Sequence, residues 1–420
     1  MAPRMTELQE ELNLDFPRCL EADFPDDLPG ARSAFESIAA AIAGADFAPL
    51  ARRSPALNGF DWRVYLRCSI ARMVHAGAAL RRRGVLSGRM LDYGSYFGNF
   101  ALMFARAGFS VDAIDSYRAY ENAFDGPRRV LASAGVQLLD FSDVGYDLAG
   151  LDTRYDVVLC MGVIEHMPSS PRPLLDTLSR ALVAGGLLVI DTPNLVHLYN
   201  RQKLARGETV LADLQAQYET ELPFEGHHRE YTIPELVWLL RRVGHHQISV
   251  EAFNYSSYAL GTLSARDVHN HWNMVRDPTM REYLMTVSAK PATDDVDGQD
   301  ERDWRSLIED PEQSWLRMLP EAMADQPAEV DVDRELQIVK VQQNYEAVQH
   351  EVNVRDQMIR DLHDRLVHEV QLRDEIIDGL RREQDWMRSG WRRFVIRLPR
   401  QRMASAAGSA TARAPNDREE

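Results

Sequence analysis

The sequence predicts an α/β protein with a Rossmann-like, mostly parallel seven-stranded sheet and helices on both faces. An N-terminal helical extension precedes the sheet, and a C-terminal α-helical coiled coil follows it. Short apolar runs alternate with helical stretches from residue 89 onward, which is typical of parallel strands joined by crossover helices. A glycine-rich turn follows the first apolar run, and a seven-residue apolar repeat begins near residue 338.

Strands are expected where apolar runs are bounded by turn residues. Helices are expected between them, at 99–107, 171–183 and 232–244. At the start of the last helix, Thr232 and Glu235 have the spacing of a capping box. The seven expected strands are 90–93, 111–115, 136–141, 155–161, 187–192, 248–253 and 284–289.

Composition divides the chain into five regions. Prolines interrupt the helical pattern of the N-terminal region, whereas the α/β pattern is continuous up to residue 290. The segment 194–231 is longer than an ordinary loop between a strand and a helix, and such insertions are usually functional or lid-like. The regions are 1–85 for the helical extension, 86–290 for the α/β domain, 291–333 for an acidic linker with a short helix, 334–390 for the coiled coil, and 391–420 for a basic and then disordered tail.

The seven-residue repeat near the C-terminal end predicts a coiled coil. With Ile338 at position a, eleven of the fifteen a and d positions up to residue 387 are apolar. Charged residues at three of the d positions weaken the pattern. The alternative is a single solvated helix that packs on the α/β domain. We favour the coiled coil, which predicts a homo-oligomer held together through residues 338–387.

Bulk composition argues against several classes of function. The net charge of −16 argues against a nucleic-acid-binding surface over the whole protein, so no nucleic-acid partner is expected. The three cysteines, at positions 19, 68 and 160, have no metal-ligand spacing and make no even disulfide framework. The first residues lack the apolar segment of a secretory signal, and no run of about 18 apolar residues is present. A cytoplasmic protein is therefore expected.

A glycine turn after the first expected strand predicts a nucleoside site. The strand ends in LDYGSYFGN, residues 91–99. A dinucleotide site needs a glycine where this turn has Tyr96, because the pyrophosphate approaches the backbone closely. Gly94 and Gly98 still permit a tight turn, so a nucleoside without phosphates fits better. Asp115 ends the second strand, 21 residues after Gly94, where a carboxylate can accept hydrogen bonds from ribose hydroxyls.

Each of these features has an ordinary structural explanation when it is taken alone. An aspartate at a strand end is often a helix cap, and a pair of glycines is often a plain turn. The order and spacing of the glycine turn and the carboxylate favour the nucleoside interpretation over these alternatives.

Three segments resemble the class I, Rossmann-like, S-adenosylmethionine-dependent methyltransferases. They are LDYGSYFGNFALMFARAG, VDAIDSY and YDVVLCMGVIEHMPSSPRPLLDTLSRALVAGGLLVIDTPN. The resemblance covers about residues 89–290 and is strongest to the ubiquinone-type O-methyltransferase branch. It implies S-adenosylmethionine as the cofactor. The sequence departs from the family pattern at Tyr96, where the family usually has glycine.

The resemblance also implies which residues contact the cofactor. The glycine turn would hold the amino-acid end, the carboxylate after the second strand the ribose, residues after the third strand the adenine, and the end of the fourth strand the floor. Cys160 is interpreted as a small apolar filler, because nothing nearby in sequence would lower its pKa. The expected contacts are Asp92, Gly94, Ser95 and Gly98 for the amino-acid end, Asp115 for the ribose, Asp143 or in a competing register Ser142 for the adenine, and Cys160 and Met161 for the floor.

Histidines in two segments are the candidates for the catalytic base. Methyl transfer to a hydroxyl requires removal of a proton near the transition state, most often by histidine. His166 follows the fourth strand, and His227 and His228 close the long insertion. The structural alternatives are a loop-fixing role for His166 and a polar helix-entry loop for the other two. His227, His228 and Glu230 could begin a metal site, but further ligands are not evident, so no metal is predicted.

The C-terminal tail gives the only clue to the acceptor. A coiled coil followed by WRRFVIRLPR resembles the ends of bacterial surface-polysaccharide enzymes. This implies a sugar hydroxyl in a surface glycan or its lipid-linked precursor. Residues 388–402 carry six arginines and no acid among aromatic and aliphatic residues, which suits peripheral contact with the inner face of the membrane or, alternatively, the basic end of a helix.

Two other functions are kept open by the sequence. A quinol or phenolic metabolite is the alternative acceptor, as the resemblance to the ubiquinone-type branch allows. A non-catalytic coiled-coil scaffold with a vestigial methyltransferase domain is the other alternative, because Tyr96 stands in the glycine turn.

Overall fold

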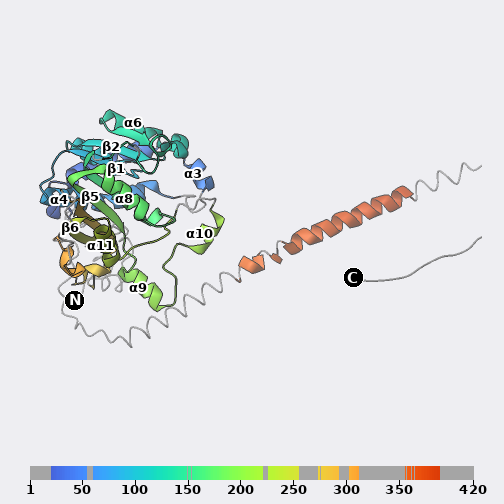
Figure 1. Ribbon diagram of the computed structural model, residues 1–420. Helices are drawn as coiled ribbons and strands as arrows, with labels where there is room; N and C mark the ends of the chain where they lie inside the picture. Colours follow the sequence, from blue (N-terminus) through green and yellow to red (C-terminus); the bar gives the residue numbers. More distant parts are fainter. Residues whose placement is uncertain are drawn as a thin grey trace, which may run out of the picture. The chain divides into compact units, whose positions relative to one another are not determined.

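The first structural unit, residues 1–325, is built on a sheet that has eight strands among the described residues (Figure 1). Their order in the computed structural model is β3-β2-β1-β4-β5-β7-β6-β8, and β7 alone of these runs antiparallel to its neighbours. The first five strands follow the Rossmann order, which places a topological switch point between β1 and β4. The strands are β1 (Arg89–Tyr93), β2 (Ser110–Asp115), β3 (Gln137–Asp140), β4 (Tyr155–Met161), β5 (Leu182–Pro193), β6 (His246–Phe253), β7 (Tyr283–Ala289) and β8 (Ile308–Glu309).

The chain divides into two units, residues 1–325 and 326–420. The N-terminal helical extension lies, where it is described, in the first unit together with the sheet. The structure describes residues 20–53, 60–220 apart from 149 and 153, 226–254, 273–292 apart from 275, 302–311, and 355–387 apart from 356, 361 and 364.

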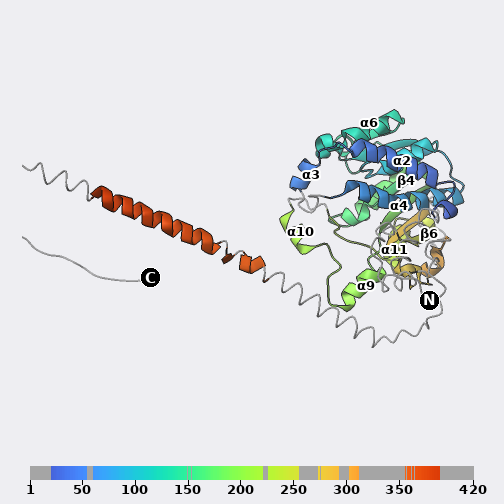
Figure 2. The same cartoon turned by 180° about the vertical axis from the view of Figure 1, so that it is seen from behind.

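Helices cover both faces of the sheet, as the sequence predicts. Helices α2, α4, α5 and α6 share one hydrophobic cluster with the sheet, and α8 and α11 share the other. Figure 1 shows α8 and α11 in front, and Figure 2 shows α2 and α4 from behind. The helices of this unit are α2 (Leu28–Ile42), α3 (Ala48–Arg53), α4 (Trp62–Arg82), α5 (Asn99–Arg106), α6 (Asp125–Ser133), α7 (Phe141–Val144), α8 (Arg172–Ala181), α9 (Leu198–Ala205), α10 (Leu214–Glu219) and α11 (Ile233–Arg242), with 3₁₀ turns η2 (Tyr117–Phe124), η3 (Ile164–His166), η5 (Pro278–Met280) and η6 (Trp304–Leu307).

Strand β4 shows how the sequence produces two cores. Successive side chains of a strand point to opposite faces, so a strand covered on both sides is apolar throughout. Val157 and Leu159 pack in the cluster under α2, α4 and α5, whereas Val158 and Cys160 pack in the cluster under α8 and α11. The run VVLCM, buried at every residue, is therefore the part of a central strand that is covered on both faces.

The sheet has one strand more than the seven predicted. Residues 304–309 lie in the segment interpreted as an acidic linker, but η6 and β8 return there to the sheet, and β8 pairs in parallel with β6. Leu307 is buried in the cluster under α11. The Arg281 guanidinium holds the end of this segment, because its Nη1 lies 2.6 Å from Oδ1 of Asp310. The acidic composition of this segment does not indicate a strand. The strand forms by pairing with β6, which is distant in sequence.

The third expected strand ends one residue earlier than predicted. Phe141 begins α7 instead of closing β3, because the Asp140 carboxylate accepts a hydrogen bond of 2.9 Å from the Ser142 backbone N–H. This is an N-cap, which starts a helix at the following residue. The capping box at Thr232 and Glu235 is present as predicted at the start of α11.

The insertion 194–231 carries the short helices α9 and α10. Its two ends meet in an isolated parallel bridge between Asn194 and Tyr231. The Asn194 side-chain amide donates to the carbonyl oxygens of Thr279 and Arg281, at 2.9 and 2.7 Å, which fixes the start of the insertion beside β7. Leu214 and Tyr218 of α10 are 75% and 87% exposed, so this helix presents apolar surface.

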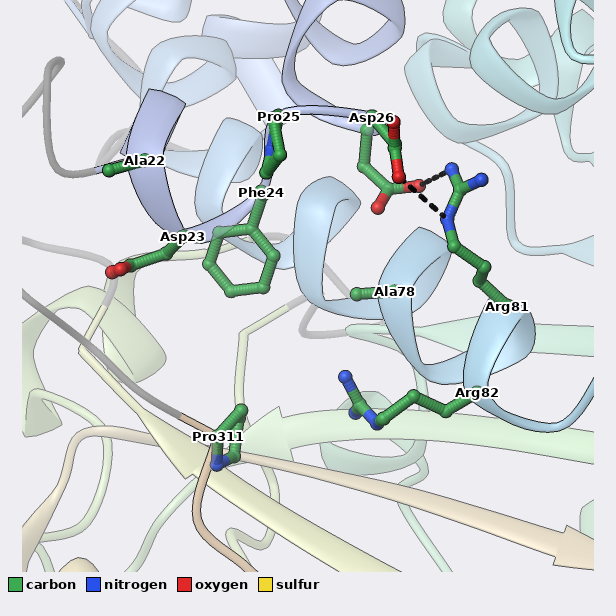
Figure 3. Close-up of a pocket in the computed structure, with 10 residues that line it drawn as sticks. Ala22, Asp23, Phe24, Pro25, Asp26, Ala78, Arg81, Arg82 and Pro311 are labelled. Atoms are coloured by element: carbon green, nitrogen blue, oxygen red, sulfur yellow. Dashed lines mark hydrogen bonds and ion pairs between the residues drawn. The ribbon is translucent and has the colours of Figure 1, made fainter.

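A cavity of about 300 Å³ lies at the C-terminal end of α4 (Figure 3). Its wall includes Phe24, Arg82 and Pro311, and the Arg81 guanidinium forms an ion pair with Asp27 at 2.8 Å. Helix α4 leads through a short turn into β1, so this end of α4 lies at the amino edge of the sheet. The cavity is therefore remote from the carboxyl edge, where ligands bind in this kind of fold.

The second unit contains a helix in the described residues between 355 and 387. Its apolar side chains are exposed, among them Ile359, Leu362, Leu366 and Ile376 at the predicted a and d positions. The first part of the predicted coiled coil, up to residue 354, and the basic segment 388–402 lie outside the described residues. In the described part of the chain, no helix is both long enough and apolar enough to cross a membrane.

Candidate functional site

The glycine turn lies at the carboxyl end of β1, beside the switch point between β1 and β4. Gly94 and Gly98 have φ angles of 73° and 78°, in the left-handed region that side chains disfavour. A Cβ atom at Gly94 would lie 2.5 Å from Cγ2 of Val163, and one at Gly98 would collide with Leu131. Both glycines are therefore required by the backbone angle and by the close approach of neighbouring side chains.

Tyr96 adopts the left-handed conformation that a glycine would take, with φ of 49°. A side chain in this region costs about 1–2 kcal/mol in backbone energy. Its ring packs edge-on against Phe97 and Phe124, with centroids 4.5 and 5.1 Å apart, and lies 5.8 Å from Trp62 of α4. These aromatic contacts offset the backbone cost, and they place a ring of the N-terminal extension beside the turn.

Asp115 fastens the glycine turn to the end of β2. Its carboxylate accepts hydrogen bonds of 2.6 Å from the backbone N–H groups of Tyr96 and Ser116, and a third from the Tyr120 side chain. Burial raises the pKa of Asp115, and these three hydrogen bonds oppose the shift. A carboxylate offers about four lone-pair positions, so one remains for a ribose hydroxyl, and rotation of Tyr120 would release another.

The other residues expected at the amino-acid end of the cofactor already form hydrogen bonds within the domain. Asp92 is buried and accepts a hydrogen bond of 3.1 Å from the Ala101 backbone N–H in the first turn of α5. Burial raises the pKa of Asp92 to about 7. The Ser95 hydroxyl lies 2.5 Å from the Tyr117 hydroxyl, which links the glycine turn to η2.

Asp140 organises the residues expected at the adenine, and the sequence analysis did not select it. Its carboxylate accepts from the Ser142 hydroxyl at 2.6 Å and from the Arg118 backbone N–H at 2.9 Å. The Arg118 guanidinium then donates to Ser142 and to Asp143. Asp140 is the register partner of Asp115 at the ends of neighbouring strands, and this pairing is the signal that could have identified it.

Cys160 and Met161 point to opposite faces of β4. Cys160 is fully buried under α8 and α11, and Met161 is buried in the cluster under α4 and α5. Burial raises the pKa of the Cys160 thiol well above its usual value, so it stays protonated and unreactive at neutral pH.

Beyond β4, the chain places one buried carboxyl beside two histidines. Glu165 and His166 in η3 and His227 at the end of the insertion have side-chain ligand atoms that all lie within 4.8 Å of one another. The Glu165 backbone carbonyl accepts hydrogen bonds from the N–H groups of His228 and Arg229, at 2.7 and 3.2 Å. These bonds bring His227 to His166, with ring centroids 4.9 Å apart, whereas His228 contributes its backbone to the contact.

Burial and nearby charges shift the pKa values of Glu165 and His227 in this cluster. Glu165 is 1% exposed, and burial raises its pKa to about 7. Burial lowers the pKa of His227, but its hydrogen bond with Glu230 and the charges of Glu165 and Glu230 outweigh this and raise it overall. Sequence reasoning selected His166 and His227 but missed Glu165, because its burial and its proximity to the insertion are tertiary features.

The N-terminal extension contributes to the same edge through α4. Arg72 donates from Nε and Nη2 to the Asp191 carboxylate at the end of β5, at 2.8 and 2.7 Å. Tyr65 lies seven residues earlier on the same face of the helix, and its hydroxyl bonds to Arg72. Burial raises the pKa of Asp191, while Arg72 lowers it. The sequence analysis missed Tyr65, Arg72 and Asp191.

Residues 63–250 match the family model described as a methyltransferase domain. This chain carries a methyltransferase domain. The match includes most of α4, the glycine turn, Asp115 and the Glu165 cluster, and it ends within β6. Residues 63–250 therefore form a methyltransferase domain, for which S-adenosylmethionine is the expected cofactor.

Similar solved structures cover about half of the chain. A SAM-dependent methyltransferase from Archaeoglobus fulgidus is 17% identical, with 51% of this chain and 93% of that chain covered and a TM-score of 0.35. The 1,6-didemethyltoxoflavin-N1-methyltransferase of Burkholderia thailandensis is 18% identical, with coverage of 52% and 77% and a TM-score of 0.33. The PH0226 protein of Pyrococcus horikoshii is 16% identical, with coverage of 58% and 100% and a TM-score of 0.37. No curated protein matches the chain.

The methyltransferase domain has residues that fit S-adenosylmethionine. The turn at Gly94 and Gly98 presents backbone without side chains, and the Asp115 carboxylate keeps a lone-pair position for a ribose hydroxyl. Tyr96 occupies the place where a pyrophosphate would approach, which suits a nucleoside that carries no phosphate. Ser142 and Asp143 lie next to the end of β3, on the side of β2 away from β1.

Replacing Asp115 by alanine is expected to weaken cofactor binding about 10–150-fold, which corresponds to about 1.5–3 kcal/mol. The ribose loses a charged acceptor, and the Tyr96 N–H loses its partner. Calorimetry with S-adenosylhomocysteine measures the change. Asp112→Asn is the matched control, because Asp112 is buried in the same strand but bonds to Tyr155. Unchanged affinity in a folded Asp115→Ala protein would show that Asp115 does not hold the ribose.

Proposed function

We infer that the methyltransferase domain transfers the methyl group to a hydroxyl oxygen. The observation that supports this most directly is the Glu165, His166 and His227 cluster beyond β4. An alcohol is a poor nucleophile until its proton is removed, so an O-methyltransferase needs a proton acceptor at this edge. Ring orientation is fixed in both histidines, because Nδ1 of His166 lies 3.2 Å from the Gly226 carbonyl and Nδ1 of His227 lies 3.0 Å from Glu230.

The residues of the domain align the reactants and receive the proton. S-adenosylmethionine, when bound, supplies a methyl group already activated by the sulfonium, so alignment is the main task of the protein. The glycine turn and Asp115 would hold the cofactor, with Ser142 or Asp143 near its adenine. The histidine of the cluster nearest to the acceptor takes the hydroxyl proton. The insertion 194–231, which carries His227 and the exposed apolar side chains of α10, would cover the acceptor.

We propose a sugar hydroxyl of a bacterial surface glycan, or of its lipid-linked precursor, as the acceptor. The proposal is supported by the exposed apolar stripe of the helix in 355–387 and by the basic, aromatic segment 388–402. Self-association through 338–387 would place several basic segments on one particle, and their weak affinities for an anionic membrane would add. The enzyme would then act in the cytoplasm, at the inner face of the membrane.

A quinol or phenolic metabolite is the second candidate acceptor. The apolar side chains of Leu211, Leu214 and Tyr218, each more than 70% exposed on the insertion, would suit an aromatic ring. The non-catalytic scaffold with a vestigial domain would match the same family model over residues 63–250, so calorimetry is the test: no heat of binding with S-adenosylmethionine would favour the scaffold.

Removing residues after about 330 is expected to leave an active monomer that has lost its preference for long acceptors. An isolated helix with an exposed apolar seam is marginally stable in water, so self-association is the simplest way to bury it. Light scattering compares the full-length and shortened proteins. Transfer of a labelled methyl group is then measured on a lipid-linked oligosaccharide, the free oligosaccharide and a quinol.

The two measurements test separate parts of the proposal. The expected result is an oligomer that methylates both sugars and a monomer that methylates only the free oligosaccharide efficiently. A full-length protein that is monomeric at micromolar concentration would contradict the coiled coil. Methylation of the quinol, with none of either sugar, would replace the glycan by the small-metabolite acceptor.

A further inference from the structure

We propose that Glu165, His166 and His227 bind a divalent first-row transition-metal ion. The side-chain ligand atoms of these residues lie within 4.8 Å of one another. Donor atoms on a common zinc ion, at bond lengths of about 2.0–2.2 Å, lie about 3 to 3.5 Å apart. Side-chain movements of about 1 Å would therefore close the three groups around an ion. Two imidazoles and one carboxylate form a donor set that suits zinc, iron or manganese.

Both histidines are oriented in the way that metal-bound histidines are. A ligating imidazole usually donates its second ring N–H to a carboxylate or a backbone carbonyl, which fixes the tautomer and directs the other nitrogen to the metal. Nδ1 of His166 lies 3.2 Å from the Gly226 carbonyl oxygen, and Nδ1 of His227 lies 3.0 Å from the Glu230 carboxylate. Each ring then carries its lone pair on Nε2.

The buried carboxyl gives an independent indication of a ligand. Glu165 is 1% exposed, and its Oε2 atom is buried with no hydrogen-bond partner among the described residues. An unpaired buried carboxylate is costly, and such groups are usually paired or coordinate a metal. The nearby guanidinium of Arg72 is already engaged by both oxygens of Asp191. A cation between Glu165 and the two histidines would satisfy the remaining oxygen.

The backbone around the cluster provides both rigidity and access. Glu165 and His166 belong to a short 3₁₀ turn directly after β4, and the His228 N–H bonds to the Glu165 carbonyl at 2.7 Å. This bond fixes the end of the insertion against the turn. The His227 side chain is 39% exposed, so an ion can enter from solvent, whereas Glu165 closes the inner side.

The ion would explain how a hydroxyl acceptor is activated, and this role rests on the proposed function. Three protein ligands leave open positions for an acceptor oxygen, as in catalytic zinc sites. A coordinated hydroxyl loses its proton at lower pH because the cation stabilises the negative oxygen. With the ion bound, Nε2 of both histidines is coordinated, so the hydroxyl proton passes to water instead of to a histidine. The oxygen then forms its new bond to the methyl carbon as the carbon–sulfur bond breaks, with the electron pair going to sulfur.

Cobalt(II) titration of the chelator-treated full-length protein tests the site. Binding of one cobalt ion per chain is expected, with a ligand-field spectrum typical of nitrogen and oxygen donors. Glu165→Gln and His227→Ala are expected to weaken binding by at least about 10–100-fold, and Glu230→Gln by about 10-fold because it orients His227. His228→Ala is the matched control, since its backbone N–H is retained, and it should bind cobalt within a few-fold of the unchanged protein.

Thermal unfolding of each variant shows whether it is folded, and the isosteric Glu165→Gln change keeps the buried volume. The proposal is overturned if folded Glu165→Gln and His227→Ala proteins bind cobalt as tightly as the unchanged chain. It is also overturned if the unchanged chain binds no stoichiometric ion.

The cobalt experiment uses neither cofactor nor acceptor, so it is independent of what is methylated. A metal-bound protein that methylates no hydroxyl would overturn the proposed function and keep the metal site. Methyl transfer to a hydroxyl at full rate by the metal-free protein would overturn the role of the ion and keep the proposed function.

Discussion

Replacing Arg72 by methionine is expected to lower the free energy of unfolding by about 3–5 kcal/mol. The guanidinium makes two hydrogen bonds to Asp191, and the two side chains are only 8% and 0% exposed. Without Arg72, the Asp191 carboxyl remains in the core beside β5 with no cation. The substitution also removes a cation–π contact, since the guanidinium lies 4.9 Å from the centre of the Tyr283 ring. Urea denaturation measures the loss.

A double substitution separates the unpaired charge from the loss of packing. Arg72→Met combined with Asp191→Leu should regain most of the stability, because apolar groups of similar volume replace a buried ion pair at little cost. Arg89→Met is the surface control. Its pair with Asp112 is 3.5 Å long and its side chain is 46% exposed, so a change of about 0.2–1 kcal/mol is expected. Equal losses of unfolding free energy in Arg72→Met and Arg89→Met would show that the buried pair contributes no more to stability than the surface pair.

Replacing His227 by alanine is expected to lower kcat by about 10²–10⁴-fold while cofactor binding survives. His227 is one of the two imidazoles beside Glu165, whereas the expected cofactor contacts lie at the glycine turn and β2. Removing it leaves the acceptor hydroxyl without one of the groups that receive its proton or hold its activating ion. Steady-state kinetics gives kcat, and calorimetry with S-adenosylhomocysteine gives cofactor affinity.

The neighbouring histidine is the control for this experiment. His228 is adjacent in sequence, but its backbone N–H bonds to the Glu165 carbonyl, and alanine retains this group. His228→Ala should therefore reduce kcat much less than His227→Ala. Equal reductions, or near-normal turnover in His227→Ala, would show that the Glu165 cluster does not activate the acceptor.

The residues expected to hold the cofactor could be grouped from the sequence because they are local to successive strand ends. The turn at Gly94 and Gly98 directly follows an apolar strand, and Asp115 directly follows the next one. Parallel strands place such strand ends at one edge of the sheet, so sequence order alone brings them near each other. Asp140 lies at the same edge and follows the same rule, but it was read as the interior of a longer strand.

The side proposed for the acceptor could not be predicted in the same way because its parts are distant in sequence. Arg72 and Asp191 are 119 residues apart, and Gly226 and His166 are 60 apart. Nothing in the local pattern of α4 distinguishes Arg72 from an arginine on a solvated helix face. Arg72 is buried because its side of the helix faces the end of β5.

The sequence by itself determined the α/β alternation, the glycine turn, the strand-end carboxylates and the capping box of α11, because periodicity and backbone chemistry act over a few residues. The tertiary structure decided the eighth strand, the burial of Glu165 and the selection of His227 over His228. Those features depend on long-range packing: β8 pairs with β6, and backbone hydrogen bonds from His228 and Arg229 to the Glu165 carbonyl hold the end of the insertion against the turn after β4. Burial and pairing are properties of such contacts, and they turn ordinary glutamate, arginine and histidine residues into a site.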